Sequence, residues 1–236
     1  HDIGTIKMEV IRNIEPENNF LQKVRDLATK RGIILIFDEC TSGFRETFGG
    51  IYKKFQIAPD ILVLGKALGN GYPITAILGI KDLMESSRKT FISSTFWTER
   101  IGPVAALKTL EIMKNIKSWN IITEKGKFLN NQWKKIANEN NIDIEINGLP
   151  SISKFVIKSK NFQEYKTLIT QEMLKKGFLA TNTVYLSIYH DRKTLDNYLN
   201  NLNDIFKKIR QCENGSLKIT NLLETSVARI PFSRLN

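Results

Sequence analysis

The chain has 236 residues, 42% of them hydrophobic, which is enough for one large core or two smaller ones. Lys and Arg outnumber Asp and Glu by 35 to 24, giving a net charge of +11. Because these basic residues are spread along the chain instead of forming one block, we expect a solvated lysine-rich surface and no nucleic-acid partner.

The cysteines and histidines argue for a reducing environment. There are two of each, without metal-ligand spacing, which argues against a zinc site and favours free thiols in the cytoplasm. No apolar run reaches the length of a membrane span and no signal peptide is visible, so we expect no membrane contact. The sequence begins at His1 without an initiator methionine, and we expect further motifs upstream of it.

The first elements alternate between strand and helix. A short strand is expected over Gly4–Ile11, and residues 33–37 are predicted to be a continuous apolar strand of a parallel sheet. Between them, a helix ending at Gly32 has an apolar face made of Phe20, Leu21, Val24, Leu27 and Ala28. Ligands of such sheets bind at the carboxyl ends of strands, which is where Asp38 lies.

The next strand, Ile61–Gly65, is followed directly by Lys66. A short helix near residues 50–55 fits within the crossover that precedes this strand. We therefore expect Lys66 to lie at the same edge of the sheet as Asp38, at the end of the neighbouring strand. The turn after Lys66 is too short for a parallel crossover, so the strand over 74–80 should be antiparallel. Its glycines should leave open space around Lys66.

The second half has a different order of predicted helices and strands. After a loop and a helix near 94–113, the sequence predicts a small α+β domain. Its expected elements are a helix over 119–140, strands near 142–146 and 153–158, a helix over 162–176, strands near 178–188 and a helix over 194–211. The predicted domains are 1–115 as part of a large domain, 116–212 as the small domain and 213–236 as a loosely attached tail.

Three interpretations compete for the acidic end of the strand at Asp38 and Glu39. The acids could meet surface lysines. Residues Ile33–Glu39 could be the Walker B strand of a P-loop NTPase, although "LGKALGNG" lacks Walker A spacing and that loop would have to lie upstream. In the third interpretation, Asp38 and Lys66 act together on pyridoxal phosphate (PLP). This cofactor needs a lysine amine for its aldehyde and a carboxylate for its pyridine nitrogen. The pyridinium would then be the cationic partner of Asp38.

Three stretches carry a family resemblance: "LIFDECTSGFR", "PDILVLGKALGNGYPITAILG" and "SSTFWTERIGPVAALKTLE". They resemble the class III aminotransferases, especially the glutamate-1-semialdehyde 2,1-aminomutase branch and related aminotransferases of surface-polysaccharide synthesis. The resemblance implies the α/β PLP-dependent transferase fold type I: a mixed, mostly parallel sheet with helices on both faces, plus a C-terminal α+β small domain. It also implies PLP, a homodimer and a small amino/oxo substrate such as an amino acid, a semialdehyde or a keto-sugar.

The resemblance also assigns roles at the centre of the site. Lys66 would be the Schiff-base lysine and proton shuttle, and Asp38 the partner of the pyridine nitrogen; these two are the predicted catalytic residues. Cys40 stands where the family usually has Val and would pack against the cofactor ring as a small apolar group.

Three further cofactor contacts are implied by the resemblance alone. Thr95, with Ser94, would supply a hydroxyl to the cofactor phosphate of the neighbouring subunit, and Asn13 would lie near the ring oxygen. The family's phosphate-binding loop and ring-stacking aromatic belong to an N-terminal part that is missing here. The alternative is therefore a catalytically incomplete fragment or partner subunit with the same fold.

Overall fold

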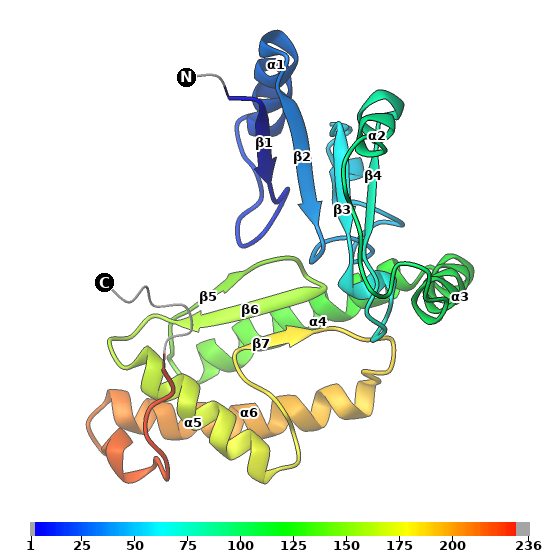
Figure 1. Cartoon of the computed structure of the whole chain (residues 1–236). Helices are drawn as coiled ribbons and strands as arrows, with labels where there is room; N and C mark the ends of the chain where they lie inside the picture. The colour runs from blue at the N-terminus through cyan, green and yellow to red at the C-terminus, as the bar shows by residue number, and fades with distance from the viewer. Residues whose placement is uncertain (1–2, 230–236) are drawn as a thin grey trace. The chain divides into compact units, whose positions relative to one another are not determined.

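The computed structural model describes residues 3–229, which divide between Thr123 and Glu124 into two compact units (Figure 1). No helix within this range has the length and hydropathy needed to span a membrane. Each unit contains one sheet, and the first carries the chemistry of interest.

A four-stranded sheet organises the first unit, in the order β1-β2-β3-β4 (Figure 1). Its strands are β1 Thr5–Met8, β2 Ile34–Glu39, β3 Ile61–Leu64 and β4 Ala76–Gly79. The pairs β1–β2 and β2–β3 are parallel, whereas β3–β4 is antiparallel. The expected reversal of the last strand is confirmed.

Helices lie on both faces of this sheet, as expected. They are α1 Phe20–Arg31, α2 Lys81–Ser87, α3 Ile101–Ile116 and the 3-10 helices η1 Ile51–Lys54 and η2 Lys66–Leu68. On one face, Leu62 and Leu64 of β3 pack with Ala106 of α3. The opposite face of β3 carries Ile61, and there Met84 of α2 approaches the adjoining strand. Helix α2 was not predicted.

Helix α1 ends as predicted but buries less than its pattern suggested. Gly32 closes it in a left-handed conformation, with φ of 63° and an N–H that bonds back to the last turn. Leu21 and Ala28 are buried, but the side chains of Phe20 and Leu27 remain 49% and 50% exposed. The predicted apolar face is therefore only partly buried.

The second unit has the α+β architecture expected of it. Its antiparallel sheet has the order β5-β6-β7. The elements are α4 Ser118–Glu139, which begins in the first unit, β5 Ile144–Asn147, β6 Ile152–Ile157, α5 Phe162–Lys175, β7 Thr183–Tyr185, α6 Arg192–Glu213 and η3 Ile219–Asn221.

Aromatic side chains form the centre of the second core. The ring of Phe155 lies edge-on to Trp133 and Phe206, with centroid separations of 4.9 and 5.8 Å. The indole Nε1 of Trp133 donates a hydrogen bond of 3.2 Å to the Tyr198 hydroxyl, so this buried polar group is satisfied.

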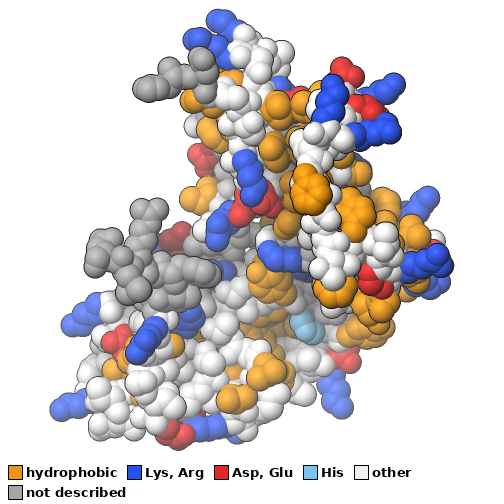
Figure 2. All heavy atoms as spheres, in the orientation of Figure 1, with side chains coloured by type: hydrophobic (Ala, Val, Ile, Leu, Met, Phe, Trp, Pro, Cys, Tyr) orange, Lys and Arg blue, Asp and Glu red, His pale blue; other side chains and the backbone are white. Residues whose placement is uncertain are grey.

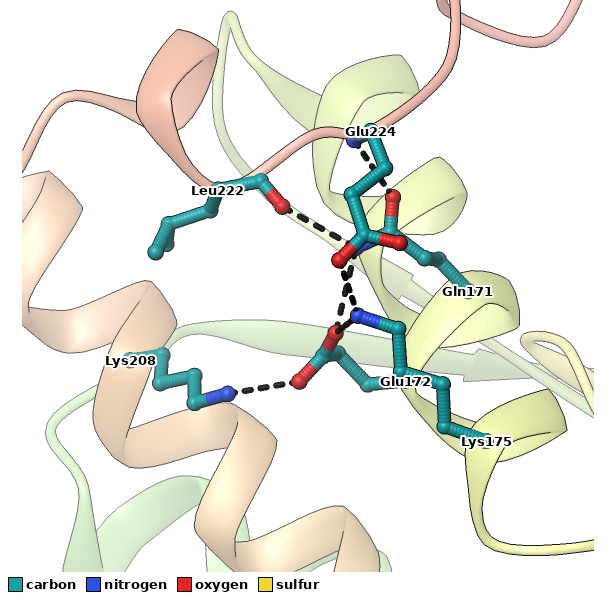
Figure 3. Close-up of polar contacts among 6 residues, drawn as sticks. All are labelled: Gln171, Glu172, Lys175, Lys208, Leu222 and Glu224. Carbon is teal, nitrogen blue, oxygen red and sulfur yellow. Dashed lines mark hydrogen bonds and ion pairs between the residues drawn. The ribbon is translucent and has the colours of Figure 1, made fainter.

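Side chains of α5 bind the segment after α6 (Figure 3), whereas the end of the predicted tail, 213–236, lies outside the described residues. The side-chain amide of Gln171 donates to the carbonyl of Leu222 at 2.9 Å and accepts from the N–H of Glu224 at 2.8 Å. The ammonium of Lys175 pairs with both Glu172 and Glu224. Hydropathy alone did not reveal this attachment, because polar contacts make it.

Candidate functional site

The candidate site lies where β2 and β3 end, at one edge of the first sheet. Asp38 is paired in register with Val63, and Glu39 with Leu64. Lys66 begins η2 two residues after the paired Leu64. The expected placement of Asp38 and Lys66 at the ends of adjacent parallel strands is confirmed.

The two consecutive carboxylates have different environments, because successive side chains of a strand point to opposite faces. Glu39 is fully buried and accepts hydrogen bonds from the N–H groups of Ile51 and Tyr52 and, at 3.3 Å, from the Ser42 hydroxyl. Burial raises the pKa of Glu39, although these donors oppose the shift. Glu39 therefore anchors the first turn of η1 and does not face the site.

Asp38 points to the other face and is half-buried. Its Oδ2 lies 2.9 Å from Nζ of Lys7, and its Oδ1 accepts the N–H of Cys40 at 3.2 Å. The hydrogen bond from Lys7 is the main cause that lowers the pKa of Asp38, so the carboxylate is ionised at neutral pH.

Sequence reasoning missed Lys7 as a partner of Asp38. The signal was present in the strand alternation: Lys7 is paired with Ile36, and Asp38 follows Ile36 by two residues on the same face. The strand GTIKMEVI was predicted, but its register against β2 was not, so Lys7 could not be placed.

Lys66 is exposed and has an unusual backbone. Its φ of 44° lies in the left-handed region that residues other than glycine seldom adopt. Its Nζ donates a hydrogen bond to the hydroxyl of Thr41, which follows the end of β2. Thr41 was also missed from the sequence, although it stands directly after Cys40.

Glycine at position 65 allows the close approach of the two strand ends. A Cβ at Gly65 would lie 3.1 Å from Cγ2 of Thr75 and 3.3 Å from Sγ of Cys40, tighter than ordinary side-chain contacts. An open hollow of about 640 Å³ adjoins it, lined by Lys66 and residues 71–75. The predicted open space around Lys66 is confirmed.

Cys40 lies between the two charged groups. Burial is the main cause that raises the pKa of its thiol, the charge of Asp38 raises it further, and Lys66 opposes the shift. The thiol is therefore neutral at pH 7 and can serve as a small apolar surface, whereas a reactive cysteine needs a lowered pKa.

The structure brings Asp38, Cys40 and Lys66 together and leaves the other predicted site residues apart. Asn13, Ser94 and Thr95 are all exposed. Within residues 3–229, no hydrogen bond joins them to Asp38 or Lys66, and Ser94 Oγ accepts one from the N–H of Phe96 in its own loop. Their roles stay predictions.

Comparison with known proteins identifies the family. The sequence profile described as aminotransferase class-III matches residues 13–205. The chain belongs to the class III aminotransferases. Within residues 3–229, this class III chain offers nothing that supports the P-loop NTPase alternative.

Curated relatives of this class III chain include two kinds of enzyme. It is 34% identical over 176 residues to the 3-aminobutyryl-CoA aminotransferase of Cloacimonas acidaminovorans (strain Evry), covering 74% of this chain and 42% of the relative. It is 31% identical over 227 residues to the glutamate-1-semialdehyde 2,1-aminomutase of Sulfurihydrogenibium azorense, covering 87% and 53%. The chain thus spans about half the length of the curated relatives it matches.

Solved structures establish the fold. The FumI protein of Sphingopyxis sp. MTA144, in its PLP internal aldimine form, superposes with a TM-score of 0.82 at 20% identity, covering 94% of this chain and 56% of that one. An omega-transaminase from Sphaerobacter thermophilus gives 0.77 at 19% identity, covering 87% and 52%. The expected fold type I of the PLP-dependent transferases is confirmed.

Proposed function

We propose that this chain is part of a PLP-dependent class III aminotransferase or aminomutase, which moves an amino group between an amino and an oxo substrate. One observation carries the proposal: an ionised Asp38 and the exposed Lys66 stand at adjacent strand ends, and Lys66 lines an open hollow of about 640 Å³. Its relatives, an aminotransferase and an aminomutase, and its structural neighbour in a PLP internal aldimine form agree with this chemistry.

The residues present fit PLP. The Lys66 amine faces open space, where it can bind the cofactor's aldehyde carbon. A carboxylate held ionised, as Asp38 is, can keep a pyridine nitrogen protonated. The neutral thiol of Cys40 lies between them and offers apolar contact to a ring. When bound, the cofactor supplies an electron sink for negative charge at the substrate carbon that carries the amine.

The protein's own groups then have separate tasks. Lys66 would hold the cofactor, and its amine is placed to move the proton at the substrate carbon. The hydroxyl of Thr41 accepts a hydrogen bond from Lys66 Nζ and so orients the amine. Asp38 would bind the ring nitrogen and hold its proton.

The substrate is proposed only as a class. An amino acid, a semialdehyde or a keto-sugar would need the same Asp38 and Lys66, and the two curated relatives carry out different conversions.

We place the enzyme in the cytoplasm, where its free Cys40 and Cys212 would stay reduced. The second candidate is a catalytically incomplete fragment or partner subunit, which is favoured by the coverage of about half of each relative.

We further propose a twofold homodimer, supported by an exposed apolar surface. The loop before α3 exposes Phe91, Phe96 and Trp97 by 97%, 77% and 65%, and α3 itself exposes Val104 and Leu107 by 62% and 69%. Figure 2 shows hydrophobic side chains gathered over this part of the first unit. Such a patch is unusual on a monomer. Thr95 lies within the loop, where it would reach the cofactor phosphate of the partner.

Mixing Thr95→Val chains, which should retain PLP poorly, with Lys66→Ala chains tests the shared site. If Thr95 acts across the interface, a heterodimer of Thr95→Val and Lys66→Ala chains has one site with both defects and one intact site. Activity should therefore return on mixing. No regained activity despite proven subunit exchange would mean that Thr95 acts within its own subunit or not at all.

Asp38→Asn tests the proposed chemistry. The amide fits the same space, so Lys66 should still bind PLP, visible as the yellow absorption of the bound cofactor. Single-turnover amino transfer should fall by about 100-fold or more, because a neutral amide cannot hold the ring proton. Asp26→Asn on the exposed side of α1 is the matched control and should keep wild-type rates. Equal rates in Asp38→Asn and wild type would refute the role of Asp38. A chain that stays colourless at saturating PLP would favour the fragment.

A further inference from the structure

Lys7 is a cation bound to the carboxylate that the proposed cofactor needs. Lys7 on β1 and Asp38 on β2 project from the same face of adjacent parallel strands, because Lys7 is paired with Ile36. The ammonium nitrogen lies 2.9 Å from Oδ2 of Asp38. The Cys40 N–H occupies Oδ1, so both carboxylate oxygens already have a donor.

A pyridine nitrogen bound at Asp38 would require the same kind of contact. Hydrogen bonds from charged donors to a carboxylate are short and strong. With Oδ1 bonded to the backbone and Oδ2 bonded to Lys7, a protonated ring nitrogen would approach a carboxylate that already holds an ammonium. Two cations on one oxygen would also repel each other.

The ammonium is free to leave. The Lys7 side chain is 61% exposed, whereas that of Asp38 is 26% exposed. Lys7 has a flexible four-carbon stem, and water can solvate its charge once it turns away. Glu9, two residues along the chain, also acts on the charge of Lys7 and offers an alternative partner.

We propose that Lys7 competes with the cofactor's ring nitrogen for Asp38 and thereby weakens PLP binding to this chain. The inference rests on the proposed function and adds a residue that sets cofactor affinity without touching the substrate. In the cofactor-free protein Lys7 keeps Asp38 ionised and in place; on binding, the protein gives up that ion pair. The Lys7 side chain is largely exposed, so loss of the pair changes a dissociation constant by about fivefold at most.

The sign of the effect separates this mechanism from general electrostatics. The cofactor's phosphate is anionic, so removing a lysine anywhere near the site should weaken binding by lowering the positive potential. If Lys7 competes with the cofactor, removing Lys7 should instead strengthen PLP binding. The dissociation constant of PLP, measured by equilibrium dialysis at fixed ionic strength, distinguishes the two outcomes and requires no enzymatic turnover.

The test compares five 236-residue chains: wild type, Lys7→Met, Lys7→Gln, Lys7→Arg and Lys23→Met. Lys7→Met should bind PLP about two- to fivefold more tightly than wild type. Lys7→Arg keeps a cation beside Asp38 and should match wild type or bind more weakly. Lys23 is an exposed lysine of α1, and its replacement should leave the constant unchanged or raise it. Lys7→Gln, which keeps the polarity of this exposed position, should repeat the result of Lys7→Met if the methionine variant folds poorly.

Two failures are distinguishable. In the first, borohydride fixes PLP onto Lys66 in every variant, yet Lys7→Met and Lys7→Gln bind PLP no more tightly than wild type. This result would refute the competition and leave the proposed function standing. If no variant holds PLP on Lys66, both the proposed function and the inference that rests on it are overturned.

Discussion

Glu172 of α5 binds Lys208 of α6 and Lys175, which also pairs with Glu224 in the segment after α6, so replacing Glu172 should destabilise the second unit in a pH-dependent way. The carboxylate accepts hydrogen bonds from Lys208 at 2.6 Å and Lys175 at 2.9 Å (Figure 3). Lys175 also reaches Glu224 beyond η3. Glu172→Gln keeps the shape and removes the charge on which both contacts depend.

The magnitude follows from the pKa of Glu172. Burial opposes its ionisation, but hydrogen bonds from Lys208, Lys175 and Gln171 outweigh burial and lower the pKa from 4.5 to about 2. At about 1.4 kcal/mol per pKa unit, the ionised carboxylate stabilises the fold by at most about 3.5 kcal/mol. Both lysines are partly exposed, so screening reduces the expected loss in Glu172→Gln to about 1–2 kcal/mol at pH 7.

The sign of the pH dependence is fixed by the lowered pKa. The folded-state pKa lies below the unfolded-state value, so the stabilisation is complete above pH 4.5 and is lost as pH falls toward about 2. The difference in unfolding free energy between wild type and Glu172→Gln should be constant from about pH 7 to 5.5 and less than half as large at about pH 3.

Urea unfolding of the second unit measures this difference. The chain has three tryptophans, and changing Trp97 and Trp119 to Phe leaves buried Trp133 as the only fluorescent reporter, within the second unit. Glu139→Gln is the control, because its ion pair with Lys135 is long, at 3.8 Å, and exposed. A pH-independent difference, or one no larger than in Glu139→Gln, would refute the reasoning.

Two other predictions concern packing and buried polarity. Glu39→Ala should lower the unfolding free energy by about 2–4 kcal/mol, because the N–H groups of Ile51 and Tyr52 lose their buried acceptor; a loss below about 1 kcal/mol in thermal denaturation would contradict this. Gly126→Ala should destabilise the second unit by about 2 kcal/mol or more, since a Cβ there would lie 1.7 Å from the carbonyl oxygen of Pro150. A wild-type urea midpoint for that variant would show that the contact relaxes freely.

The parts of the site that the sequence predicted depend on neighbours along the chain. A continuous apolar strand, a crossover and a second strand place Asp38 and Lys66 at one edge of a parallel sheet whatever the details of packing. Gly32 ends α1 through its own backbone freedom, which is likewise local. The antiparallel β4 followed from the length of a turn.

The parts that could not be predicted depend on register and on surface supplied by distant segments. Lys7 meets Asp38 only because β1 pairs with β2 in one particular register. Phe20 and Leu27 lie on the correct helical face but remain half exposed. Periodicity identifies the side that a helix buries, not how much of that side the rest of the chain covers.

The central claim is that Lys66 binds PLP covalently. The most direct measurement is borohydride reduction of the chain with PLP, followed by digestion and mass spectrometry of the modified peptides. Modification should concentrate on Lys66, disappear in Lys66→Arg and persist in Lys53→Arg, a control at an exposed lysine of η1. Modification spread evenly over the surface lysines and unchanged in Lys66→Arg would contradict the account.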